Sequence, residues 1–173
     1  SDSRLFCVTF AIWQYAKGIA HAVLGNIDEA LTQQVKLRAA IAALPDERIV
    51  FHNDSKDILQ VADKMLTGEL EYRRENYDEA FKNLRWAVAC YDNLNYSEPW
   101  SWMMPPRHAL GALLLEQNKV EEAMSVYSAD LGLDTLVRPS QHAGNIWSLL
   151  GYVECCERTV SYTHLTLPTI AKV

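Results

Sequence analysis

Apolar residues recur every three or four positions along most of the chain, which is the spacing of one face of an α-helix. Leu84, Ala87, Val88 and Tyr91 follow this spacing. All prolines before residue 160 fall in three segments where helices are expected to break: 44–58, 93–107 and 131–145. The pattern predicts helices near residues 8–24, 27–43, 56–74, 77–92, 106–117, 120–130 and 144–158.

Short polar turns join these helices in pairs, in the stretches LGNIDEA, RENYDEA and EQNKVEEA. Each turn has a glycine before it and an alanine after it, twelve residues apart: Gly18 and Ala30, Gly68 and Ala80, Gly111 and Ala123. Small residues let two helix axes approach to about 8–10 Å. The pattern therefore predicts antiparallel helix pairs that are in closest contact at these positions.

This organisation resembles the tetratricopeptide repeat (TPR), a helix–turn–helix unit with a W…LG…Y…A…F…A pattern. The matches are 68–88 and 108–127, a weaker one at 17–31, and an opening at 145–158 where the match stops. The glycines are 50, 43 and 40 residues apart, wider than the usual ~34 of the family. The repeat framework would consist of Gly18, Ala30, Gly68, Tyr77, Ala80, Ala87, Leu110, Gly111, Ala123, Tyr127, Trp147, Leu150 and Gly151.

The resemblance implies an all-α fold, a TPR-like α-α superhelix over residues 1–158. Its units would span about 8–43, 56–92 and 106–131, with an incomplete unit at 144–158. The last helix would then expose an apolar face containing Trp147, Leu150 and Val153, through which the chain would associate with itself.

The final stretch, 159–173, does not continue this pattern, because it is β-branched and contains Pro168. Val160–Thr169 is identical to the translation of a transposase mosaic-end sequencing adapter. We expect a non-native, disordered tail and a TPR fragment truncated at both ends; the alternative is a genuine tail with β-propensity.

Charge and hydropathy narrow the choice of partner. The chain has 22 acidic and 16 basic residues and a net charge of −6, without a basic cluster. Nucleic acid is therefore not an expected partner. No apolar run approaches the ~20 residues of a membrane span, so membrane is not an expected partner either. A missing signal peptide says nothing of compartment where the true start is in doubt, and a cytoplasmic location is the default expectation.

Catalytic motifs are not found in the sequence: it has no Gly-rich phosphate loop, G-x-S-x-G or H-E-x-x-H. The histidines before residue 160 are scattered one per segment, without the spacing of metal ligands. We expect no catalytic residue, metal or cofactor, and no enzyme activity.

The TPR resemblance implies a protein or peptide ligand on the concave face, which the first helices of the units form. The positions that would line it are Tyr15, Ile19, Met65, Glu69, Tyr72, His108, Ala112, Ser148 and Tyr152. They lack the Lys and Asn of a carboxylate clamp. The groove would instead be Tyr-rich and mildly acidic, suited to a peptide with apolar and basic residues.

The stretch YSEPWSWMMPPRHALG (96–111) has two interpretations. In one, Trp100, Trp102 and Met103 fill the gap that the wide repeat spacing leaves. In the other, they form a recognition surface with Arg107 and His108 at its edge. The candidate partner-binding residues are Tyr15, Glu69, Tyr72, Trp100, Trp102, Arg107, His108 and Tyr152.

The leading hypothesis is a non-catalytic protein- or peptide-binding module, a scaffold or adaptor. One alternative is the repeat arm of a larger enzyme or regulator. The other is a small-molecule or metal site at the 96–111 loop, near Trp100, Arg107, His108 and His142.

Overall fold

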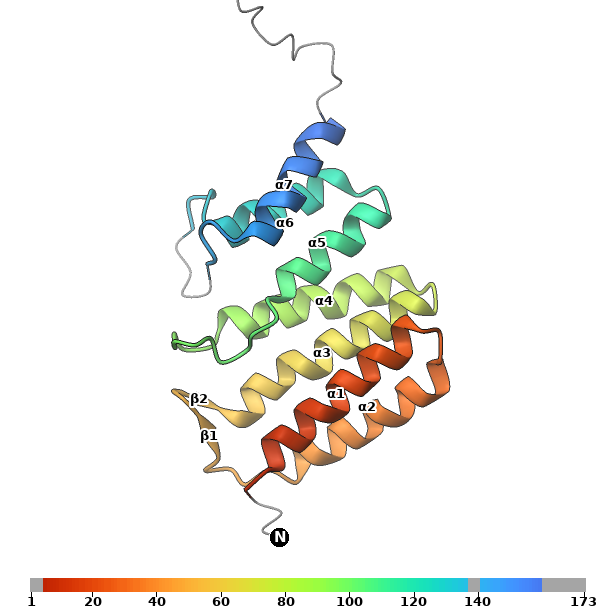
Figure 1. Ribbon diagram of the computed structural model, residues 1–173, viewed down its shortest axis with the longest axis vertical. Coiled ribbons are helices and arrows are strands. Elements are labelled where there is room, and N and C mark those ends of the chain that lie inside the picture. Colours follow the sequence, from red (N-terminus) through yellow and green to blue (C-terminus); the bar gives the residue numbers. More distant parts are fainter. Residues whose placement is uncertain (1–4, 137–140, 160–173) are drawn as a thin grey trace, which may run out of the picture. The chain divides into compact units, whose positions relative to one another are not determined.

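The computed structural model describes residues 5–136 and 141–159, and the fold of these residues is all-α (Figure 1). They form α1 (Cys7–Val23), α2 (Ile27–Ala42), β1 (Ile49–Val50), β2 (Asn53–Asp54), α3 (Ser55–Arg73), α4 (Tyr77–Asp92), α5 (Pro106–Glu116), α6 (Val120–Leu131) and α7 (Ile146–Thr159). The seven expected helices are confirmed, with ends within two residues of the prediction. Thr159 ends α7, and the rest of the stretch interpreted as an adapter lies outside the described residues.

The described residues divide into two compact units, and the boundary falls within α5. Unit 1 comprises the described residues up to Ala109, and unit 2 those from Leu110 onward. The single repeat domain that the sequence predicts over 1–158 stays a prediction. None of the helices in the described part of the chain combines the length and the apolar character needed to cross a membrane.

Three turns of the chain have the same backbone geometry, between α1 and α2, α3 and α4, and α5 and α6. Each contains one residue in the left-handed region: Gly25 (φ 80°), Glu75 (φ 64°) and Asn118 (φ 55°). The N–H of the next residue donates to the carbonyl five residues earlier, at 2.9 Å in all three turns: Asn26 to His21, Asn76 to Glu71, and Lys119 to Leu114. This is the Schellman arrangement, which satisfies the last carbonyls of a helix and ends it.

Unit 1 consists of two antiparallel helix pairs, α1 with α2 and α3 with α4, and both α1 and α2 pack on α3 (Figure 1). A Cβ on Gly68 would lie 2.6 Å from the Leu84 side chain of α4 and 3.3 Å from the Ala80 carbonyl. The close approach expected at Gly68 is therefore present. A Cβ on Gly18 would lie 2.7 Å from the Leu66 side chain. The small size of Gly18 therefore allows the close approach of α3, not that of α2, the partner of α1 in its helix pair.

The core of unit 1 lies among these four helices. Leu37, Leu59 and Leu66, from α2 and α3, are fully buried in it. Burial of apolar surface on one stripe of each helix stabilises the packing by about 25 cal/mol per Å².

A short β-hairpin precedes α3, which the sequence did not indicate. Ile49 pairs with Asp54 and Val50 with Asn53. Strands of two residues are too short to show the alternation by which a strand is recognised. Asp54 then caps α3, since its carboxylate accepts a hydrogen bond from the N–H of Lys56 at 2.7 Å.

Unit 2 is built around Tyr127 of α6. A Cβ on Gly111 of α5 would lie 2.5 Å from the Tyr127 ring, and one on Gly151 of α7 would lie 2.3 Å from it. Both glycines are therefore needed for the ring to fit. The face of α7 that was expected to be open, with Trp147 and Leu150, is exposed.

Candidate functional site

The segment between α4 and α5, residues 93–105, is neither helix nor strand, yet besides burying Leu94, Ser97 and Pro105 it inserts one aromatic side chain into unit 1. That side chain is Trp102, which is 4% exposed. Its ring meets the Tyr15 ring of α1 edge-on, with centroids 5.1 Å apart and planes at 73°. Its indole N–H donates a hydrogen bond to Met65 Sδ of α3 at 3.2 Å. We call Tyr15 and Met65 the indole site.

The chemistry of the indole site fits an aromatic ring with one N–H donor. A thioether sulfur is polarizable and accepts weak hydrogen bonds, and it packs well against aromatic rings. The Tyr15 hydroxyl also donates to Met65 Sδ, at 3.8 Å. Burial, with a smaller contribution from the charge of Glu69, raises the pKa of Tyr15 above its usual value. The hydroxyl therefore remains a donor at all ordinary pH values.

One asparagine of the β-hairpin holds the inserted segment. The Asn53 amide nitrogen donates to the Asn95 carbonyl at 2.9 Å and to Ser101 Oγ at 2.8 Å. Its amide oxygen accepts from the Asn95 N–H at 2.6 Å. Ser97 Oγ lies 2.7 Å from Ser101 Oγ, which ties the two ends of this stretch together. Because Asn53 is itself buried, these hydrogen bonds are shielded from water.

A shallow pocket lies beside the segment. Its lining residues are Tyr91, Leu94, Asn95, Tyr96, Ser97, Trp100 and Ser101, and they enclose about 270 Å³, part of it open to solvent. Ligand pockets usually hold about 300–1,000 Å³. The enclosed part of this space is only about 20 Å³, room for about one water molecule, so the pocket is too small for a small-molecule ligand.

Arg107 and His108, expected at the edge of a recognition surface, lie in the first turn of α5. Both guanidinium nitrogens of Arg107 bind the carboxylate of Asp92, each at 2.6 Å, and the Arg107 side chain is 7% exposed. This is the bidentate geometry that suits Arg and carboxylate. The Arg107 guanidinium is therefore already bound to Asp92 at the end of α4. His108 is half-buried.

The remaining candidate residues make other contacts. Tyr72 is buried and packs edge-on against Tyr77, with ring centroids 5.2 Å apart. Glu69 binds Arg73 of its own helix at 2.8 Å. Tyr152 is half-buried on α7 of unit 2. Of the candidate residues, the structure brings Tyr15 and Trp102 into direct contact.

Framework positions of the repeat pattern are mostly internal. The buried ones are Gly18, Ala30, Gly68, Ala80, Ala87, Leu110, Gly111, Ala123, Tyr127 and Gly151. Tyr77 is half-buried, and Trp147 and Leu150 are exposed.

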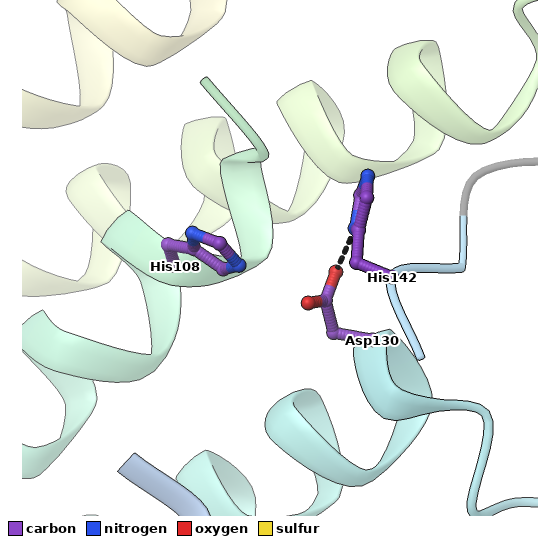
Figure 2. Close-up of side chains that lie close together, drawn as sticks. All are labelled: His108, Asp130 and His142. Carbon is purple, nitrogen blue, oxygen red and sulfur yellow. Dashed lines mark hydrogen bonds and ion pairs between the residues drawn. The ribbon is translucent and has the colours of Figure 1, made fainter. Parts of the chain in front are cut away.

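Unit 2 contains a buried polar cluster of Asp130, His142 and Ser148. Sequence reasoning named His142 and Ser148 for other roles and missed Asp130, which Figure 2 shows beside His142. Asp130, at the end of α6, is fully buried. Its carboxylate binds His142 Nδ1 at 2.7 Å and accepts from Ser148 Oγ at 2.5 Å. The His142 backbone N–H also donates to the Asp130 carbonyl, at 2.7 Å. The cluster thus fastens the loop before α7 to the end of α6.

A signal for the cluster is present in the sequence. Ala123, Tyr127 and Asp130 stand at the i, i+4 and i+7 positions of one helix face. A carboxylate on an otherwise apolar face must find partners within the core. The spacing therefore could have indicated a buried, hydrogen-bonded Asp130.

The geometry of the cluster does not suit nucleophilic catalysis. In a Ser-His-Asp triad the histidine lies between the other two and takes the serine proton. Here Ser148 donates to Asp130, which is the central member of the cluster. Asp130 and His142 each also offer one possible metal-ligand atom.

Comparisons with protein-family models, curated proteins and solved structures gave no match to this chain.

Proposed function

We propose that the chain is a non-catalytic, TPR-like helical repeat module that binds an extended segment of a partner protein at the first helices α1 and α3. Its helix pairs would belong to an α-α superhelix of the TPR kind. The partner would be a protein or peptide, for which the module acts as a scaffold or adaptor.

Support for the repeat assignment comes from the turns. Gly25, Glu75 and Asn118 adopt the same left-handed conformation at the same place in three helix–turn–helix stretches. Glutamate and asparagine adopt this conformation at a cost, because only glycine enters it freely. A shared turn that persists through three different residues favours three copies of one structural unit.

The observation that carries the binding proposal is the position of Trp102. The indole site combines one residue of α1 with one of α3, and both were expected to line the ligand groove. It holds a side chain from a stretch of chain that is neither helix nor strand. The surface between these two helices therefore already accommodates the kind of ligand that the proposal assigns to it.

Ile19 offers a way to test the site, because it lies one turn after Tyr15 on α1 and is half-buried. A random peptide library would be displayed on phage and selected against the wild-type chain and against Trp102→Ala. Affinities of the selected peptides would then be measured by fluorescence anisotropy. We expect Ile19→Arg to weaken binding at least tenfold, because it places a charge beside the site.

Val35→Arg on α2 serves as the matched control, since Val35 is exposed on the other helix of the pair. It should leave the affinities unchanged. The proposal fails if neither protein selects any peptide, or if the selected peptides bind Ile19→Arg as tightly as they bind wild type.

A further inference from the structure

We propose that the segment 95–102 is a built-in ligand that closes the indole site, and that the partner segment able to open it is an extended peptide containing a tryptophan. This inference rests on the proposed function and specifies its ligand. It concerns unit 1 alone.

Trp102 is buried, whereas the other large apolar side chains near it along the segment are exposed. Trp102 is 4% exposed, whereas Trp100 is 39%, Met103 71% and Met104 59% exposed. If the stretch served only to fill a gap in the core, all of these large apolar side chains would gain from burial. A single anchor between exposed apolar neighbours is instead how a peptide ligand occupies a groove. The packing interpretation therefore holds for Trp102 alone among these residues.

The indole site favours tryptophan over other aromatic residues. Met65 Sδ accepts the indole N–H at 3.2 Å, and Tyr15 presents its ring to the indole edge-on. Phenylalanine would fill part of the space but offers no donor. Tyrosine carries its donor at the far end of the ring, displaced from the position of an indole N–H. A tryptophan of a partner could reproduce both contacts.

The way the segment is anchored would allow a partner tryptophan to replace Trp102. The β-hairpin fastens the segment through the side chain of Asn53, which binds Asn95 and Ser101, and through the His52 carbonyl, which accepts a hydrogen bond from the Asn95 side chain. The segment contributes no strand or helix, so its release breaks no secondary structure. An incoming tryptophan would replace the contacts of Trp102, while the helices keep their positions.

Closure of the indole site by the segment lowers the apparent affinity of the chain for a partner peptide. A ligand that binds only the open state has its apparent Kd multiplied by the reciprocal of the open fraction. Any change that weakens closure should therefore tighten binding of the same peptide, without a new contact between peptide and protein.

The direct experiment uses the chain's own sequence as a probe. A labelled peptide of residues 95–104, NYSEPWSWMM, is titrated by fluorescence anisotropy into the full chain and into its Trp102→Ala variant. We expect the variant to bind at least tenfold more tightly than wild type. A peptide with Trp102→Ala should lose binding, whereas one with Trp100→Ala should retain it, because Trp100 lies outside the indole site.

Asn53→Ala provides a second protein variant, which loosens the segment without emptying the indole site. We expect it to bind the unaltered peptide several-fold more tightly than wild type, with a helical circular dichroism spectrum. Should Trp102→Ala not fold, this variant decides the matter. Equal affinity of wild type and Asn53→Ala, or no binding to either, overturns the inference.

The two proposals fail separately. Library peptides that bind at Ile19 but lack tryptophan, and bind equally with and without Trp102, would retain the function and remove the built-in ligand. Loss of all peptide binding would remove both.

Discussion

In unit 1, the segment after α4 is held by a buried indole together with the hydrogen bonds of Asn53, whereas in unit 2 the loop after α6 is held by a buried carboxylate. Trp102 meets Tyr15 and Met65 through a ring contact and a weak hydrogen bond to sulfur. Asp130 binds His142 and Ser148 through short hydrogen bonds. Both attachments join a loop to a helical core, but their energetics differ.

The difference between these two kinds of contact indicates which of the two loops can be displaced. Apolar and aromatic contacts can be exchanged for similar contacts from another chain at a small net change in free energy. A buried carboxylate whose partners leave is uncompensated, and that costs several kcal/mol. We therefore expect the attachment at Asp130 in unit 2 to be the fixed one, and the segment 95–102 of unit 1 to be the one that a ligand can replace.

The largest expected effect breaks the fixed loop. Asp130→Ala leaves His142 and Ser148 without the carboxylate, and we expect a loss of about 3–5 kcal/mol in the free energy of unfolding of unit 2. Urea unfolding followed by hydrogen exchange of α6 and α7 measures it. Glu157→Gln, at an exposed carboxylate of α7, is the control and should change little. An unchanged midpoint for Asp130→Ala would refute the assignment of this loop as fixed.

The two glycine contacts give an intermediate effect that compares the units directly. In Gly151→Ala the new methyl meets the Tyr127 ring, which Gly111 of α5 confines on another side. In Gly18→Ala it meets only the end of the flexible Leu66 side chain. We expect a cost of about 2–3 kcal/mol for Gly151→Ala and about 1 kcal/mol or less for Gly18→Ala.

Thermal and urea unfolding of both alanine variants would test this order. Tyr127→Leu should recover part of the loss in Gly151→Ala, because the shorter side chain makes room for the methyl group. If the two glycine variants are equally stable, the difference in rigidity between the units does not hold.

The helices and their turns could be predicted from the sequence, whereas the single contacts that hold the two loops could not. The helices were predictable because their apolar spacing is long and regular, and the turns because glycine or a polar stretch interrupts it. The burial of Trp102 was left open, because a buried and an exposed tryptophan look alike in a loop. Asp130 was missed because its partner Ser148 lies 18 residues away, across a proline-containing segment. Long-range pairing of single polar residues has no periodic signature.

A smaller effect than that of Gly151→Ala concerns alkaline pH and unit 2. Burial, with the neighbouring acidic groups adding to it, raises the pKa of Tyr127 from 10.0 to about 12. The folded state thus favours the neutral hydroxyl. Its contribution to stability is complete below pH 10 and is lost as the pH rises toward 12. At pH 11 we expect a loss of about 1.4 kcal/mol relative to pH 9.

Tyr127→Phe removes this titrating group and serves as the comparison. Urea unfolding at pH 9, 10 and 11 should show a shallower decline for the variant than for wild type. Parallel curves would mean that Tyr127 does not resist ionisation in the folded state.

The most direct test of the central claim is the environment of the Trp102 indole in the full chain. In a nuclear magnetic resonance spectrum, its N–H proton should show a nuclear Overhauser contact with the Met65 methyl group and slow exchange with water. Trp13, which is exposed on α1, supplies the reference for fast exchange. A Trp102 indole that exchanges as fast as that of Trp13, without contact to Met65, would contradict the account.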